Sequence, residues 1–108
     1  MKIDFNNMTS NTIKNYKDGP GELLSKVVYD GNRKIMIHTI KKDSGIGYHY
    51  HDLNEEFVFV LKGIGTVKED KDISYKIYPG DACLIHRQHG HSIINEDDED
   101  LEILSLVG

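Results

Sequence analysis

Short apolar runs, each ended by turn residues, dominate the chain from about residue 22 onwards. The runs are rich in Val, Ile, Tyr and Phe and are interrupted by Gly, Asn, Asp or Lys, a pattern typical of β-strands. No ten-residue window after Gly21 has an apolar period of 3.6 residues, so helices are not expected there. We expect strands at Leu23–Tyr29, Lys34–Ile40, Tyr48–His51, Phe57–Leu61, Thr66–Glu69, Ile73–Ile77, Ala82–Ile85, His91–Asn95 and Leu101–Val107.

Tight turns separate several of these runs. Asp30-Gly31-Asn32 and Gly63-Ile64-Gly65 contain residues that accept positive φ, and Pro79-Gly80-Asp81 combines a preset φ with a glycine. Short connections favour antiparallel neighbours and leave no room for the crossover helices that parallel strands need. The expected fold class is therefore all-β, with two packed antiparallel sheets or a barrel closed from them.

The first 21 residues differ from the rest of the chain. They are polar and end in Asp18-Gly19-Pro20-Gly21, a combination typical of a linker. We expect an N-terminal arm and linker over residues 1–21 and a barrel domain over residues 22–108. A length of 108 residues suits one domain with one core.

Charge and composition argue against several classes of function. The net charge is -5, and the 13 Lys and Arg residues are scattered among 18 Asp and Glu residues, so no basic surface for nucleic acid is expected. No run approaches the ~18 apolar residues of a membrane span, and the residues after Met1 lack the apolar segment of a signal peptide. We therefore expect a cytoplasmic protein without nucleic-acid or membrane partners. The single Cys83 agrees with a reducing compartment.

Histidines and one carboxylate occur at intervals that suit a metal site. His49 and His51 lie one residue apart on an expected strand, so their side chains leave the same face about 7 Å apart. Glu56 enters the next strand and offers an oxygen ligand, and His91 offers a third imidazole. His89 is the alternative third imidazole. Such a mixed set favours a divalent transition metal ion (Mn, Fe, Co, Ni or Zn) and disfavours Ca and Mg.

Two stretches of the sequence resemble the paired motifs of the cupin family. They read His49-x-His51-x4-Glu56-x6-Gly63 and Gly80-x5-His86-x-Gln88-x2-His91-x3-Asn95. The chain departs from the family pattern at three loop positions, where His86 replaces proline, Gln88 replaces glycine and Asp43 replaces the opening glycine. The resemblance covers about Lys34 to Val107 and implies a double-stranded β-helix, the cupin jelly roll. The interval to Asn95 favours His91 over His89 as the ligand.

The resemblance and the ligand set leave two classes of metal-binding function open, beside a third in which the barrel is purely structural and binds no metal. One is a metal-dependent enzyme that acts on a small oxygen-rich metabolite, such as a sugar or keto acid, by isomerase, lyase or dioxygenase chemistry. The other is a non-catalytic cupin that binds or senses a small molecule through the metal. His38 and His86 are the candidate catalytic residues, because a titratable group near the metal would distinguish the first class from the second. The alternatives are that His38 is a hydrogen-bonded wall residue and that His86 only fills the proline position.

The alternation of side chains along the strand after Glu56 predicts an oligomer. If Glu56 faces the metal, Val58 and Val60 also point inward, and three large apolar residues point outward. These outward residues are Phe57, Phe59 and Leu61. A contiguous apolar patch on an outer face needs cover from the arm before Gly21 or from a second subunit, and a twofold-related copy is the commoner solution, so we expect a homodimer. If Glu55 is the ligand instead, these three residues face the pocket and the case for a dimer is weaker.

Overall fold

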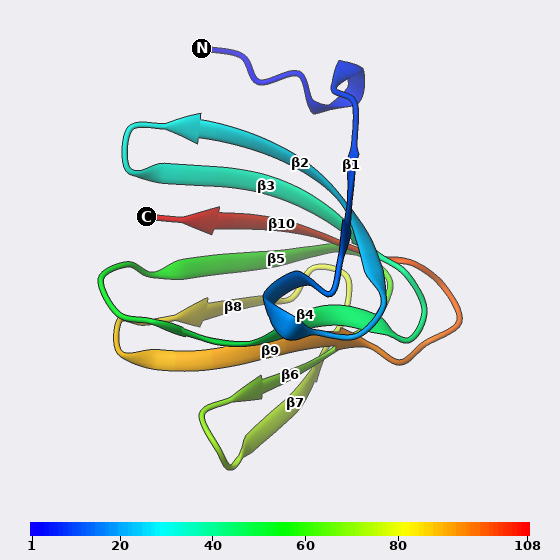
Figure 1. Ribbon diagram of the computed structural model, residues 1–108, viewed down its shortest axis with the longest axis vertical. Coiled ribbons are helices and arrows are strands. Elements are labelled where there is room, and N and C mark those ends of the chain that lie inside the picture. The colour runs from blue at the N-terminus through cyan, green and yellow to red at the C-terminus, as the bar shows by residue number, and fades with distance from the viewer.

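The computed structural model describes residues 1–108 and consists of two antiparallel sheets packed face to face (Figure 1). The strands are β1 Asn11–Lys14, β2 Glu22–Asp30, β3 Arg33–Ile40, β4 Ser44–His51, β5 Glu56–Lys62, β6 Gly65–Glu69, β7 Ile73–Ile77, β8 Ala82–Ile85, β9 His89–Asn95 and β10 Leu101–Val107. Two short 3-10 turns, η1 Phe5–Asn7 and η2 Tyr16–Asp18, flank β1. The structure confirms the all-β jelly roll of two packed antiparallel sheets.

Distant parts of the chain alternate within each sheet. The larger sheet has the order β1-β2-β3-β10-β5-β8, and the smaller sheet has the order β4-β9-β6-β7. The last strand, β10, therefore lies between β3 and β5, in the middle of the larger sheet (Figure 1). In the smaller sheet β4 pairs with β9, and the register sets His49 directly opposite His91. The topology thus brings the two motifs together.

The core lies between the sheets and is built from every second residue of a strand, whose side chains face inward. Along β5 the side chains of Glu56, Val58 and Val60 are buried, whereas Phe57 and Leu61 are exposed. This confirms the predicted parity of the strand. The apolar core cluster contains Leu23, Ile40, Ile46, Val58, Val60, Val67, Ile77, Cys83, Ile93, Leu101 and Ile103.

All nine expected strands are present, and only two of them begin more than one residue away from the expected position. Three of the predicted turn glycines, Gly31, Gly63 and Gly80, have positive φ. However, β4 begins at Ser44 rather than Tyr48, and β9 begins at His89 rather than His91. The glycine-rich start of β4 is a strand because it pairs with the end of β9, and the backbone of η2 packs closely on it. A Cβ atom on Gly47 would overlap the carbonyl oxygen of Lys17.

The N-terminal segment contributes one strand that the sequence did not predict. Within residues 1–21, β1 pairs antiparallel with β2 at the edge of the larger sheet. The pairing has little local signal because Asn11–Lys14 is polar and largely exposed. The division into an arm over residues 1–21 and a barrel over residues 22–108 stays a prediction. None of the helical segments has the length and apolar character needed to cross a membrane.

Candidate metal centre

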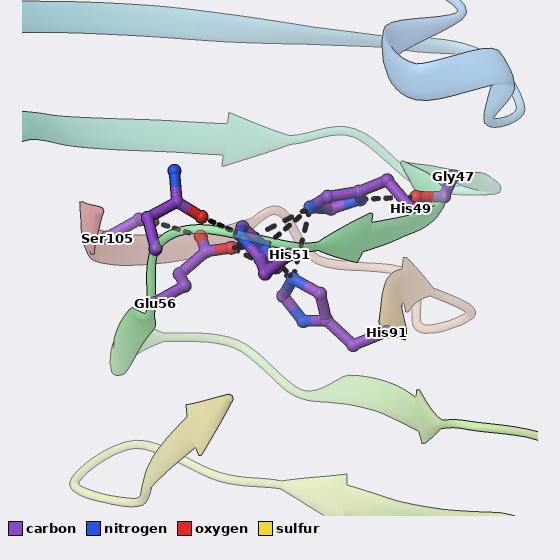
Figure 2. Close-up of polar contacts among 7 residues, drawn as sticks. Gly47, His49, His51, Glu56, His91 and Ser105 are labelled. Atoms are coloured by element: carbon purple, nitrogen blue, oxygen red, sulfur yellow. Dashed lines mark hydrogen bonds and ion pairs between the residues drawn. The ribbon is translucent and has the colours of Figure 1, made fainter. Parts of the chain in front are cut away.

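The four predicted metal ligands converge at one point between the sheets (Figure 2). His49 and His51 come from β4, His91 from β9 and Glu56 from the first position of β5. Two strands of the smaller sheet and one strand of the larger sheet therefore hold the group. His51, Glu56 and His91 are buried, and His49 is partly exposed.

The ligand atoms lie at distances typical of neighbours around one ion. The Nε2 atoms of His49, His51 and His91 are each 3.1 Å from the other two. Oε1 of Glu56 lies 3.0 Å from Nε2 of His51, 2.8 Å from that of His91 and 3.7 Å from that of His49. Ligands bound at right angles about 2.1 Å from an ion would be about 3 Å apart. The arrangement fits a shared cation.

Hydrogen bonds at the opposite ring nitrogens set the tautomers of two histidines. Nδ1 of His49 lies 2.8 Å from the carbonyl oxygen of Gly47, and Nδ1 of His51 lies 2.7 Å from Oδ1 of Asn54. Both oxygens accept a hydrogen bond, so both Nδ1 atoms carry the proton and both Nε2 lone pairs face the centre (Figure 2). Two lone pairs 3.1 Å apart repel each other unless a cation lies between them. The donor set therefore fits a divalent transition metal.

Glu56 is held as a carboxylate. Burial alone would raise its pKa, but in the metal-free protein His49, His51 and His91 can carry a proton at Nε2, and their hydrogen bonds to Glu56 then hold the pKa well below its usual range. Its second oxygen, Oε2, accepts a hydrogen bond from the hydroxyl of Ser105 on β10. The hydrogen bond with Glu56 in turn raises the pKa of His51. Ser105 was not predicted from the sequence, because a serine on an apolar strand carries no motif.

A cavity of about 360 Å³ opens beside the four ligands. Its volume is at the lower end of the range for small-molecule sites. Three of the ligands, His49, His51 and Glu56, line it together with His38. The other lining residues are Tyr16, Lys17, Lys34, Met36, Ile46, Tyr50, Asp52, Leu53, Asn54 and Val107. Tyr16 and Lys17 belong to η2, so the expected arm supplies part of the cavity wall.

The two candidate catalytic histidines occupy different places. His38 lines the cavity, is 1% exposed, and has its ring 5.7 Å from that of Tyr16. Burial lowers its pKa to about 4, against the attraction of the Glu56 charge. The Nδ1 atom of His38 has no hydrogen-bond partner, so the expected wall hydrogen bond is missing at this atom. In contrast, His86 is exposed, does not line the cavity, and pairs with Glu55 at 3.0 Å.

The choice between His89 and His91 follows from their place along β9, because the two residues share a face of the strand and differ in burial. His91 is fully buried in the ligand group, with Nε2 facing the other ligands. His89 lies two residues earlier at the exposed end of β9, and its Nδ1 pairs with a carboxylate oxygen of Asp70 at 2.9 Å. The structure therefore brings His91, and not His89, to the other three residues.

Comparisons with known proteins agree with this architecture. The family model described as the cupin domain matches residues 36–107. An oxalate-binding protein of Thermotoga maritima is 29% identical over 114 residues, covering 99% of this chain and 93% of that protein.

Two solved structures show the same fold. The crystal structure of a predicted oxalate decarboxylase from Thermotoga maritima has a TM-score of 0.93 at 24% identity, covering 99% of this chain and 97% of that one. A cupin superfamily protein from Desulfitobacterium hafniense has a TM-score of 0.70 at 13% identity, covering 78% of this chain and 74% of that one. With the family model, the two sheets and both motifs in agreement, the chain belongs to the cupin domain family.

Proposed function

We propose that this protein binds a small dicarboxylate of the oxalate type through a divalent transition metal held by His49, His51, Glu56 and His91. The observation that carries the proposal is the convergence of these four side chains beside a cavity that two lysines also line. The name of the Thermotoga maritima relative, an oxalate-binding protein, supports the choice of ligand class. The ion would supply Lewis-acid positions for carboxylate oxygens.

The residues around the cavity favour binding over acid–base catalysis. His86 lies outside the cavity, which leaves His38 as the histidine that could exchange a proton with a ligand there. Because the pKa of His38 is lowered to about 4, its imidazole is neutral at pH 7 and accepts a proton weakly. The cavity therefore has groups that hold an anion, and its one histidine outside the ligand set is a weak base at neutral pH.

Metal-dependent catalysis is the second candidate function, and His38 is the observation in its favour. A buried neutral imidazole with an unpartnered Nδ1 beside a candidate metal centre is the kind of group that isomerase or lyase chemistry uses. Dioxygenase chemistry would instead need a redox-active metal. Turnover of oxalate, sugars or keto acids by the metal-loaded protein, lost in a His38→Phe variant, would favour this function over binding alone.

The homodimer and the cytoplasmic location stay proposals, and the outer face of the larger sheet supports the first of them. A shallow hollow on this face is lined by Phe57, Leu84 and Leu106, with Arg33 and Glu55 beside them. We infer that a twofold-related copy covers this face, because such a partner can place Arg33 opposite Glu55 while the apolar side chains pack together.

The proposed function is tested by metal analysis followed by calorimetry. Untagged protein is expected to contain about one transition-metal ion per chain, and the double variant His49→Ala/His51→Ala none after dialysis against a chelator. The Mn-loaded wild type is then expected to bind sodium oxalate, while the metal-free protein and the double variant do not. Full metal content in the double variant would refute the ligand set. No oxalate binding by the Mn-loaded wild type would refute the ligand class.

A further inference from the structure

The turn η2 has an unusual backbone for residues of its type. Lys17 and Asp18, together with the preceding Asn15, all have φ between 51° and 62°. Asn and Asp tolerate this left-handed region, whereas a lysine there is uncommon and costs of the order of 1 kcal/mol. Strained residues of this kind concentrate at functional sites, so a lysine at this position calls for a role of its side chain.

The position of η2 against β4 is fixed by close backbone contact. A Cβ on Gly47 would overlap the carbonyl oxygen of Lys17, and a Cβ on Gly19 would overlap the backbone of Gly47. The carbonyl oxygen of Gly47 also accepts the hydrogen bond from Nδ1 of His49. The turn therefore lies directly beside the strand that carries two metal ligands, as the blue segment next to β4 shows in Figure 1.

The two lysines of the lining lie near different aromatic rings, and only the ring near Lys17 belongs to the cavity wall. The Nζ of Lys17 lies 5.6 Å from the ring centroid of Tyr16, a half-buried cavity residue whose ring also neighbours His38. The Nζ of Lys34, in contrast, lies 6.0 Å from the ring of Tyr29, which is 73% exposed.

The charges around the cavity match a doubly charged ligand. The lining holds two lysines, Lys17 and Lys34, and two carboxylates, Asp52 and Glu56. A divalent ion offsets the two carboxylates, so the two lysine charges remain to be balanced. A dianion such as oxalate balances them, whereas a monoanion of the same size leaves one positive charge in a partly enclosed site.

We propose that Lys17 is a specificity-determining residue, whose ammonium group pairs with a carboxylate of the bound ligand and favours dianions over monoanions. This inference rests on the proposed function. Tyr16 and Lys17 lie outside residues 36–107, the part that matches the family model. The segment before the matched region would therefore set which anion is bound, while the two motifs within it hold the metal.

The test compares oxalate with oxamate, a monoanion of similar size and planarity, by calorimetry on Mn-loaded protein. Lys17→Asn removes the ammonium group and keeps a residue that tolerates positive φ, so the turn should still fold. It is expected to weaken oxalate binding about tenfold or more and to weaken oxamate binding less. Lys17→Arg, which keeps the charge, should restore most of the oxalate affinity.

Lys14→Asn is the matched control, because Lys14 lies in β1 of the same segment and does not line the cavity. It should leave both affinities unchanged, and Mn content should stay at about one ion per chain in all variants. Unchanged oxalate affinity in Lys17→Asn would overturn the inference and leave the proposed function in place. Absence of oxalate binding in the wild type would overturn the proposed function, and this inference with it.

Discussion

Glu55 and Glu56 are neighbours in the chain but lie in opposite environments. Glu56 is 4% exposed and contacts three histidines and Ser105, whereas Glu55 pairs with His86 on the outside. We therefore predict that Glu56→Ala loses most of its bound metal and that Glu55→Ala keeps about one ion per chain. Elemental analysis after dialysis against a chelator measures both variants. Metal loss in the Glu55 variant alone would reverse the assignment.

His38 gives the stability of the metal-free protein a defined dependence on pH. Its pKa is about 4 in the folded chain, below the 6.5 of an exposed histidine, because burial disfavours the charged form. Between these values the unfolded chain binds a proton that the folded chain does not. The neutral, buried state of His38 therefore contributes its full free energy to folding above pH 6.5, and this contribution is lost as the pH falls toward 4.

We predict that the free energy of unfolding falls less in His38→Phe than in the wild type between pH 6.5 and 4. The difference between the two falls should be at most about 3 kcal/mol. Phenylalanine keeps a ring of similar size next to Tyr16. Denaturant unfolding with a chelator present, at a series of pH values, gives the two curves. Parallel curves over this range would show that His38 titrates alike in both states.

At the scale of elements, the contact of η2 with β4 predicts a specific intolerance at Gly47. Alanine there would push against the Lys17 carbonyl and displace the turn, at a cost of about 1–3 kcal/mol. We expect Gly47→Ala to lower the melting temperature and to speed trypsin cleavage after Lys17. Gly31→Ala is the comparison, since alanine at its positive φ strains a distant turn while its Cβ meets no atom within 4 Å, so this variant is destabilised without displacement of η2. Equal cleavage rates in both variants would argue against the displacement.

The elements that the sequence predicted well are those with a strong local pattern. The parity of β5 follows from alternation alone, and the intervals of the two motifs brought His49, His51, Glu56 and His91 together in one prediction. By contrast, β1 and η2 have no such pattern, because β1 is held by pairing with β2 and η2 by backbone contact with Gly47, far along the chain. For the same reason no local pattern indicated that Tyr16 and Lys17 line the cavity.

At the scale of the whole molecule, the outer face of the larger sheet predicts the state of association. Phe57, Leu84 and Leu106 are each between 37% and 49% exposed on this face. We expect sedimentation to show a dimer that Phe57→Asp converts to a monomer, because a buried unpaired carboxylate is costly. Ile73→Asp is the control, since Ile73 is an exposed residue of β7 in the other sheet. A wild-type monomer would remove the dimer from the proposal.

The central place of β10 in the larger sheet also constrains how the chain is made. During synthesis β3 and β5 emerge long before residues 101–107, and each keeps an open edge until β10 pairs with both. Open edges of this kind invite pairing with other chains. Ribosome-bound intermediates that end before Leu101 should therefore be strong clients for chaperones, and release of β10 should be the step that allows the nascent protein to leave them.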